Sequence, residues 1–446
     1  MRRIIIALMI LLMPCLAEAK SLYVAANGND SITYANNTLD APWRTVSKAL
    51  MSAQAGDTVY FRAGTYTISS KISVSTSGTI ASPITITSYQ SEPVTWQTSP
   101  SLRDPAIAMD GVSYWTFSYL TVHYAYSGTL TDPYGDRGFW RVGFDSACTH
   151  ITWDHIAGTS NATGDNFGII HIKAGCHYAT VRNSTFQFPT GGHVSTAGVI
   201  IFTSDYFTVE NNHFINGGSS FYNKHSNSTC THNKFRYNYI EQNYAGHYGY
   251  FSNSNAVDMQ HNIIYAPTAT AGAVTIGDAN GGKPNPLQDN LWRHNTIIGK
   301  FYTKYDLGGC LYNSLNYNII TGNLLQNDGM MDPRMTSYTY NLIGGSVSPS
   351  ISGNGNIIGP TPTFVGTGGY GKQASIGNYA LRSDSYGYQA CPDGTDMGAD
   401  VTKVGPEGSP SDTPEGSPSD TAEGSPSDTA GGGISSPSGL TIIKQQ

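Results

Sequence analysis

The chain has 446 residues with 24 basic and 31 acidic side chains, which gives a formal net charge of −7 at pH 7. Nucleic-acid binding needs a stripe of basic residues, so this composition excludes it. Charged residues make up 12% of the chain, about half the usual share, beside 50 glycines and 29 tyrosines, which is typical of a turn-rich β structure.

Residues 1–19 have the pattern of a secretory signal peptide. Arg2 and Arg3 precede an apolar run from Ile4 to Leu12, and small residues stand near Ala19. The apolar run is far shorter than the roughly 20 residues that cross a bilayer. We therefore expect cleavage before Lys20, a secreted protein and no membrane span.

Five cysteines remain after this cleavage, an odd number, so they cannot all pair within the chain. We expect most of them to be small buried side chains, because a chain of this length can form a core without disulfides. Cys176 and Cys230 would stand two coils apart in the repeat described below, which is too far for a disulfide. The remaining three are Cys148, Cys310 and Cys391.

The first predicted element is a short amphipathic helix within PWRTVSKALMSAQAGD (42–57). Thr45 is the expected N-cap, and Val46, Ala49, Leu50 and Ala53 follow at helical spacing. Gly56 then ends the helix, and DTVYFRAGTYT (57–67) alternates as a strand does. An amphipathic helix at this place would cover the open end of the repeat that follows.

A short pattern recurs along the rest of the chain: an apolar residue, two residues of any kind, Asn or a substitute, any residue, and an apolar residue. Successive copies end 24 to 34 residues apart. A period of this size without helices predicts a solenoid of β coils. The copies are 117–122, 151–156, 181–186, 209–214, 235–240, 259–264, 292–297 and 320–325.

A second strand precedes most copies, which predicts a parallel β-helix in which neighbouring coils lie about 4.8 Å apart. These second strands are 168–173, 198–203, 219–224, 248–253, 272–277 and 308–313. In this arrangement one asparagine per coil forms a stacked ladder, with each amide in a left-handed turn position. The expected ladder consists of Asn212, Asn238, Asn262, Asn295 and Asn323.

The entrance segment, the Asn-containing coils and the stretch NYALRSDSYGYQACPDGTDMGAD (378–400) resemble secreted right-handed β-helix proteins of the pectin-lyase-like superfamily. This resemblance implies an all-β solenoid, expected over residues 20–403, that acts as a monomer on an acidic polysaccharide. Residues 404–446 contain PEGSPSDT repeats and are expected to be a disordered tail, because they hold almost no apolar residues.

Alignment of the second strands predicts which side chains face outward together. Lys173, Thr203 and Lys224 fall in one column, with the two lysines two coils apart, roughly 10 Å. In the neighbouring column Tyr222 and Phe251 stand beside them, and with Tyr248 they are candidate stacking faces for sugar rings.

β-Elimination on a uronic acid needs a base and a positive group that neutralises the carboxylate. Similarity to chondroitinase B-like lyases makes Lys224 the candidate base, with His225 beside it, but no Arg stands in the neighbouring coils. Arg236 lies in the other strand. A calcium ion is the alternative neutraliser, held by some of Asp165, Asp258 and Asp278.

One other interpretation stays open. An outward lysine on a β-helix often only solvates the surface, and the chain is then a non-catalytic carbohydrate-binding or structural protein. ITWDHI (151–156) partly resembles a pectate lyase motif, although its spacing is one residue short, and the aspartate clusters of polygalacturonases are absent.

Overall fold

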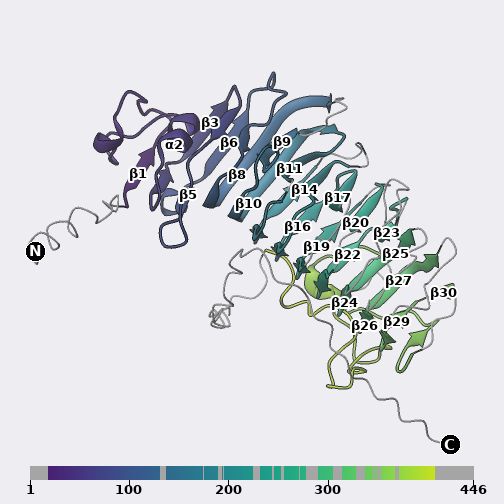
Figure 1. The fold of residues 1–446 in the computed structure, drawn as a ribbon. Helices are drawn as coiled ribbons and strands as arrows, with labels where there is room; N and C mark the ends of the chain where they lie inside the picture. Colours follow the sequence, from purple (N-terminus) through teal and green to yellow (C-terminus); the bar gives the residue numbers. More distant parts are fainter. Residues whose placement is uncertain are drawn as a thin grey trace, which may run out of the picture. The chain divides into compact units, whose positions relative to one another are not determined.

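The structure of the chain, a computed structural model, describes residues 19–130, 137–173, 175–188, 193, 195–224, 232–243, 246–252, 256–270, 272–277, 290–304, 314–327, 337–344, 347–348, 353–366 and 371–406. These residues belong to one compact unit, and strands make up most of its regular structure (Figure 1). The expected signal peptide of residues 1–19 lies outside the described residues except for Ala19. The expected tail of residues 404–446 lies outside them except for its first three residues, of which Val404 is buried in the second hydrophobic core.

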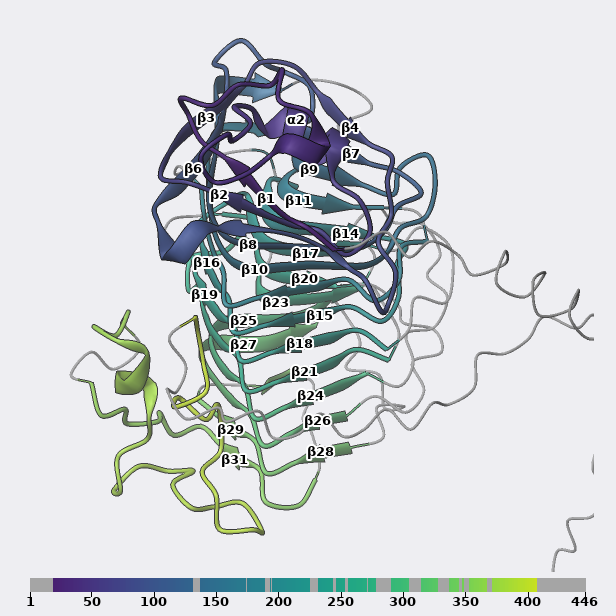
Figure 2. The ribbon, with the colours of Figure 1, turned by 90° about the vertical axis from the view of Figure 1, so that its left-hand side faces the viewer.

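The strands form three rows of parallel pairs, which we call rows A, B and C, and the chain visits the rows in turn (Figure 2). Neighbouring strands of a row come from successive coils, so the predicted parallel β-helix is confirmed. Row A contains β4 (Ile72–Val74), β7 (Ile107–Met109), β9 (Arg137–Val142), β11 (Phe167–Ile172), β14 (Ala197–Phe202), β17 (Ser219–Lys224), β20 (Tyr248–Ser252), β23 (Gly272–Gly277) and β30 (Val347–Ser348).

Rows B and C consist mostly of shorter strands. Row B contains β1 (Ser21–Val24), β2 (Thr58–Phe61), β5 (Ile84–Ser88), β12 (Thr180–Arg182), β15 (Thr208–Glu210), β18 (Lys234–Arg236), β21 (Asp258–Gln260), β24 (Leu291–Arg293), β26 (Ser314–Asn316) and β28 (Ser337–Thr339). Row C contains β3 (Gly64–Ile68), β6 (Val94–Thr98), β13 (Thr185–Gln187), β16 (His213–Ile215), β19 (Tyr239–Glu241), β22 (Ile263–Tyr265), β29 (Leu342–Ile343) and β31 (Ile357–Ile358).

Longer strands bend from one row into the next. Both β8 (Ser113–Leu130) and β10 (Thr149–Gly164) pair with strands of rows B and C, and β25 (Thr296–Lys304) and β27 (Ile319–Asn327) pair with strands of rows C and A. In every row the inward side chains stack in register. In row B, for example, Val209 pairs with Phe235, which pairs with Met259, and all three are buried in the main core.

A short helix, α2 (Val46–Ser52), lies near the N-terminal end (Figure 1). The Thr45 hydroxyl accepts a hydrogen bond of 3.1 Å from the Lys48 amide, so the predicted N-cap is confirmed. The helix buries Val46, Ala49 and Leu50 and contacts β3 and β4. Covering the open end of the solenoid stays a prediction. Single 3₁₀ turns occur as η1 (Tyr34–Asn36), η2 (Tyr89–Ser91) and η3 (Ile376–Tyr379).

A buried ladder of asparagine side chains joins the coils where row B turns into row C. The Asn212 amide donates to Asn238 Oδ1 at 3.0 Å, and Asn238 donates to Asn262 Oδ1 at 3.1 Å. The same bond continues from Asn262 to Asn295 at 2.9 Å. Each carbonyl oxygen also accepts the backbone N–H of the preceding ladder residue. The predicted ladder is therefore confirmed for these residues.

The predicted member Asn323 was wrong. Asn318 takes its place and receives the side-chain bond of Asn295 at 3.0 Å, and the ladder continues through Asn341 to Asn356. Asn323 lies within β27, which continues past the turn. At the other end Ser184 substitutes for asparagine, because its backbone N–H donates to Asn212 Oδ1. The predicted strand 308–313 lies outside the described residues.

The sequence had predicted a left-handed backbone at each ladder asparagine, and this was wrong. The left-handed backbone belongs to the residue before each ladder asparagine. These residues carry mostly rings, which stack along the solenoid, for example His261 on His294 at 4.9 Å and His294 on Tyr317 at 4.8 Å. The positive φ values are those of Asn183, Asn211, Tyr237, His261, His294, Tyr317 and Tyr340.

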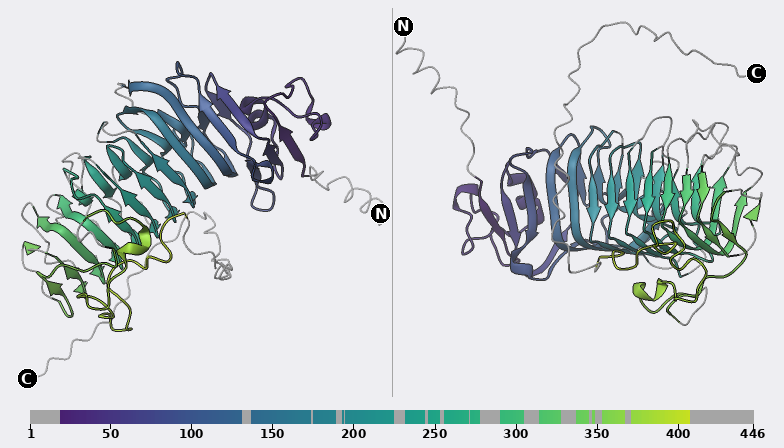
Figure 3. Two further views of the ribbon diagram at one scale, coloured as in Figure 1. Left: turned by 180° about the vertical axis from the view of Figure 1, so that it is seen from behind. Right: turned by 90° about the horizontal axis from the view of Figure 1, so that it is seen from below.

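Residues 371–406, which we call the C-terminal segment, fold back along row C (Figure 3). The Gly398 N–H donates to the Tyr317 carbonyl and the Gly405 N–H to the Tyr237 carbonyl, both at 2.8 Å. Several outward residues of row C are apolar, and the segment buries them in a second hydrophobic core. They are Tyr239, Ile263, Ile298, Ile319 and Leu342.

We predict that Asn262→Ala lowers the free energy of unfolding by about 3 kcal/mol or more, because the Asn238 backbone N–H, one side-chain N–H of Asn238 and the Phe235 carbonyl each lose a buried hydrogen bond. Urea unfolding followed by circular dichroism measures the change. The control is Asn161→Ala, since Asn161 is exposed. Equal effects of the two substitutions would contradict a stabilising ladder.

Candidate functional site

Lys173, Phe202 and Lys224 form one column on the outward face of row A. Ile172 pairs with Ile201, so Lys173 stands beside Phe202, and Phe202 pairs with Lys224. The two lysines are thus two coils apart, as predicted, roughly 10 Å by strand spacing. All three side chains are half-buried and reach solvent.

The predicted neighbour Thr203 was wrong by one residue. β14 ends at Phe202, and Thr203 follows it with a left-handed backbone. Because side chains of a strand alternate between its two faces, this one-residue shift turns Ile201 inward and Phe202 outward. The Lys224 ammonium lies 5.9 Å from the centre of the Phe202 ring, within range of a cation–π contact.

A second cation–aromatic contact lies one coil before Lys173. The Phe144 ring has the Lys173 Nζ atom 4.8 Å from its centre and the Arg141 guanidinium carbon at 4.2 Å. Arg141 also pairs with Asp110 at 3.1 Å and with Asp145 at 3.5 Å. Its charge is therefore largely neutralised by these carboxylates. We call Arg141, Phe144, Lys173, Phe202 and Lys224 the cation–aromatic strip.

His171 lies fully buried beneath this strip. Its ring contacts the Phe144 and Phe202 rings edge-on, with centroids 4.9 and 5.3 Å away. Burial, together with the charges of Lys173 and Arg141, lowers the pKa of His171 to about 3. Among the described residues neither ring nitrogen has a partner in hydrogen-bonding geometry. The imidazole is thus neutral at physiological pH and supports the rings above it.

The tyrosines predicted as stacking faces are buried. Tyr222 is 4% exposed and Tyr248 is 2% exposed, and both pack in a small apolar cluster with Ala197 and Ile200. The backbone of Phe251 pairs with Tyr222 in register, as expected. Phe202 and Phe144, the latter just after β9, are half-buried aromatic side chains with partial access to solvent.

The other predicted site residues are not gathered at Lys224. Arg236 lies in row B, where it pairs with Glu210 at 2.7 Å. Asp165 precedes β11 and accepts a hydrogen bond of 2.6 Å from the Ser195 hydroxyl. Asp258 lies in row B and pairs with Arg293 at 3.4 Å. His225 and Asp278 lie outside the described residues.

The described residues do not fit the predicted calcium site. Asp165 and Asp258 belong to different parts of different coils, and each already has partners of its own. The part of the chain that the structure describes contains no group of three or more His, Cys, Asp or Glu side chains that could hold a metal ion. A calcium ion needs about six oxygen ligands, so we derive no chemistry through one.

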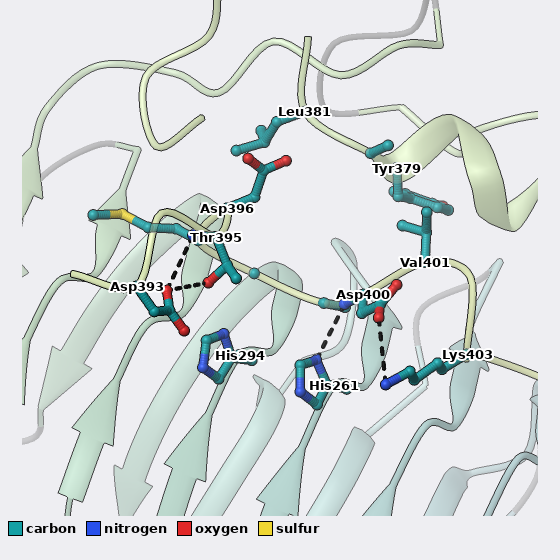
Figure 4. Close-up of a pocket in the computed structure, with 14 residues that line it drawn as sticks. His261, His294, Tyr379, Leu381, Asp393, Thr395, Asp396, Asp400, Val401 and Lys403 are labelled. Atoms are coloured by element: carbon teal, nitrogen blue, oxygen red, sulfur yellow. Dashed lines mark hydrogen bonds and ion pairs between the residues drawn. The ribbon is translucent and has the colours of Figure 1, made fainter. Parts of the chain in front are cut away.

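A cavity of about 440 Å³ lies elsewhere, between row C and the C-terminal segment (Figure 4). His261 and His294 lie on its solenoid side, and the segment brings Asp393, Asp396 and Asp400. The Asp400 N–H donates to His261 Nδ1 at 3.2 Å, and burial lowers the pKa of His261 to about 4. Three carboxylates beside neutral imidazoles repel a polyanion, so we assign no acidic polymer to this cavity.

The strip includes residues that the sequence did not single out. Arg141 and Phe144 belong to a coil whose strands match no clear copy of the repeat, and Phe202 was missed through the register error. A signal for both was present, because aromatic and basic residues alternate at the ends of successive row A strands. Among the described residues no helix is long and apolar enough to cross a membrane.

Comparison with known proteins gives a family match and a short sequence match. A family model described as "Pel9A-like, right handed beta helix region" matches residues 22–285. Pectate lyase PEL9 of Emericella nidulans is 40% identical over 76 residues, which are 17% of this chain and 18% of that protein. The chain thus aligns with less than one fifth of this relative's length.

Solved structures show the same fold at low sequence identity. The crystal structure of pectate lyase Pel9A has a TM-score of 0.50 and 15% identity, and the match covers 86% of this chain and 96% of that one. A rhamnogalacturonan lyase has a TM-score of 0.46 and 12% identity, with 82% and 97% of the two chains covered. The first of these likenesses supports the right-handed β-helix.

We predict that His171→Phe makes the protein less sensitive to acid. The pKa of His171 is lower in the folded chain than the usual 6.5, so the unfolded chain binds a proton first as the pH falls from 6.5 towards 3. Folding stability is lost over that range, by up to about 2 kcal/mol at pH 4.5. Melting temperatures at pH 7 and pH 4.5 measure it.

The control for this prediction is His155→Phe, because the His155 side chain is 40% exposed. For each variant, the melting temperature at pH 4.5 is subtracted from the melting temperature at pH 7. This gap should differ between His171→Phe and His155→Phe. The gap narrows in His171→Phe and stays as in the unchanged protein in His155→Phe. An unchanged gap in both would show that His171 is not held neutral by burial.

Proposed function

The chain belongs to the Pel9A-like right-handed β-helix family, and from this premise we propose that it is a secreted lyase that cleaves an acidic, uronic-acid-containing polysaccharide by β-elimination. One observation carries this proposal above the others. The family match at residues 22–285 contains the whole cation–aromatic strip, from Arg141 to Lys224.

Lys224 is the base in this proposal. In its neutral form the amine takes the proton from the carbon next to the uronate carboxyl group. The electrons of that C–H bond form a C=C bond, the bond to the glycosidic oxygen breaks, and the leaving oxygen takes up a proton from solvent. Lys224 stands at the end of β17 with its side chain partly open to solvent, which is where a polymer lying along row A would pass.

Lys173 contributes binding and not proton transfer. Its ammonium lies roughly two coil spacings from Lys224, so it would hold the carboxylate of a sugar further along the same chain. Phe144 and Phe202, in contact with the two lysines, offer apolar surface to the C–H faces of the sugar rings. Charge and ring thus alternate along the strip, which suits a regular acidic polymer.

A non-catalytic binding protein is the second candidate. It is favoured by the carboxylates that already pair with Arg141 and Arg236, since β-elimination needs a positive group that neutralises the carboxylate of the substrate. The same strip would then bind an acidic polysaccharide without cleaving it. The two candidates give different results in one experiment.

We predict that the secreted protein, mixed with polygalacturonate, pectin, alginate or chondroitin, releases unsaturated product that is followed by ultraviolet absorbance. Lys224→Ala should reduce the rate at least about 100-fold, because the loss of a general base typically costs 10² or more. Lys234→Ala is the matched control. Lys234 is an exposed lysine of row B, away from the strip, and its loss should leave the rate unchanged.

Retention of the protein on immobilised polymer separates the outcomes. Binding without any product assigns the chain to the non-catalytic class. Product formation that survives Lys224→Ala keeps the lyase but removes this base. If the protein neither forms product from any of the polymers nor binds any of them, the proposal is overturned.

A further inference from the structure

Cys148 and Cys176 occupy the same place in neighbouring coils. Thr149 and His177, the residues directly after them, form a parallel β-bridge. The two cysteines therefore stand one above the other, at about the 4.8 Å spacing of adjacent strands. This lies within the range of roughly 4.4 to 6.8 Å between Cα atoms that a disulfide spans.

The Cys176 sulfur lies against the Cys148 backbone. The Cys148 backbone N–H donates to Cys176 Sγ at 3.3 Å, and the Cys148 thiol donates to the Met109 carbonyl at 3.3 Å. A hydrogen bond between the two thiols raises the pKa of Cys176, with burial as the second cause. Cys148 is fully buried and Cys176 is 1% exposed, so both sulfur atoms lie in the core.

The backbone of the preceding coil is shaped to fit the Cys176 sulfur. Gly143 has a left-handed φ of 72°, and a Cβ atom at this position would lie 2.0 Å from Cys176 Sγ. No other residue type fits without moving the sulfur. The sulfur pair is therefore a close-packed part of the turn and is set in place from both sides.

We propose that Cys148 and Cys176 form a disulfide bond between neighbouring coils when the chain folds in an oxidising compartment. Two S–H bonds break and one S–S bond forms. The two electrons and two protons pass to a disulfide oxidant of the glutathione class, which is reduced to two thiols. The bond forms during folding, before the core closes, and burial then protects it from reduction.

The sequence analysis expected no disulfide between Cys176 and Cys230. Cys230 and Cys310 lie outside the described residues. Cys391 belongs to the C-terminal segment, where its thiol donates to the Asp396 carbonyl at 3.4 Å. Of the cysteines that the structure describes, only Cys148 and Cys176 are neighbours, and the odd count of five leaves at least one cysteine outside any intrachain bond.

The bond would hold the turn that carries the strip. Cys148 follows Phe144 by four residues, and Cys176 follows Lys173 by three. Linking the two coils fixes the relative height of these two side chains, independently of whether the polymer is cleaved. The inference rests on the sulfur geometry and on exposure to an oxidant, and it does not rest on the proposed activity.

Peptide mapping tests the bond directly. The protein is folded with reduced and oxidised glutathione, alkylated without reduction and cut with trypsin. Cys148 then lies in peptide 142–173 and Cys176 in peptide 174–182, and the other three cysteines lie in separate peptides. We expect the two peptides linked, with a mass two hydrogens below their sum, and separated by reductant.

Thermal unfolding gives a second readout that folding defects do not imitate. Reduction under denaturing conditions followed by refolding without oxidant should lower the melting temperature of the unchanged protein by several degrees. The same treatment should leave Cys148→Ser and Cys176→Ser unaffected, whereas Cys391→Ser should respond like the unchanged protein. Recovery of both cysteines as alkylated thiols from oxidatively folded protein overturns the proposal.

Discussion

The register between successive coils depends on amide hydrogen bonds between asparagines that occupy the same place in each coil. Asn212, Asn238, Asn262 and Asn295 are each fully buried, and each side-chain amide donates to the next coil and accepts from the preceding coil. A slip of one residue would leave these groups unpaired in the core, where an unpaired polar group costs about 1–3 kcal/mol. The ladder therefore fixes the height of every outward side chain.

The three rows share this register, but their outward faces differ. Row C presents apolar residues such as Ile263 and Ile298, and the C-terminal segment covers them. Row A presents lysines and phenylalanines at the ends of its strands, with Lys173 and Lys224 partly open to solvent. A long polymer can follow an open row of repeating charges, whereas the covered row and its acidic cavity have no such surface. The candidate site thus follows from which row stays uncovered.

The sequence alone was sufficient to predict the coils, the helix with its Thr45 cap and most of the ladder, because each of these depends on spacing within a few residues. It failed where two patterns compete locally. Asn323 fits the repeat as well as Asn318 does, and only the pairing of β27 with its neighbours separates them. The outward direction of the Phe202 side chain was predicted wrongly for a related reason, since a shift of one residue in a strand exchanges its inward and outward side chains.

The burial of Tyr222 and the closeness of Cys148 and Cys176 were beyond sequence reasoning for a different reason. Tyr222 is buried by side chains of neighbouring row A strands, and Cys148 and Cys176 lie in turns, where the repeat pattern has no copy. Where a strand supplies the register, sequence spacing predicts neighbours. Where a turn supplies it, only coordinates do. The proposed lyase chemistry requires a base and a group that binds the carboxylate, and strands and turns together place them. Sequence spacing was sufficient to predict the two lysines at the ends of strands, Lys173 and Lys224.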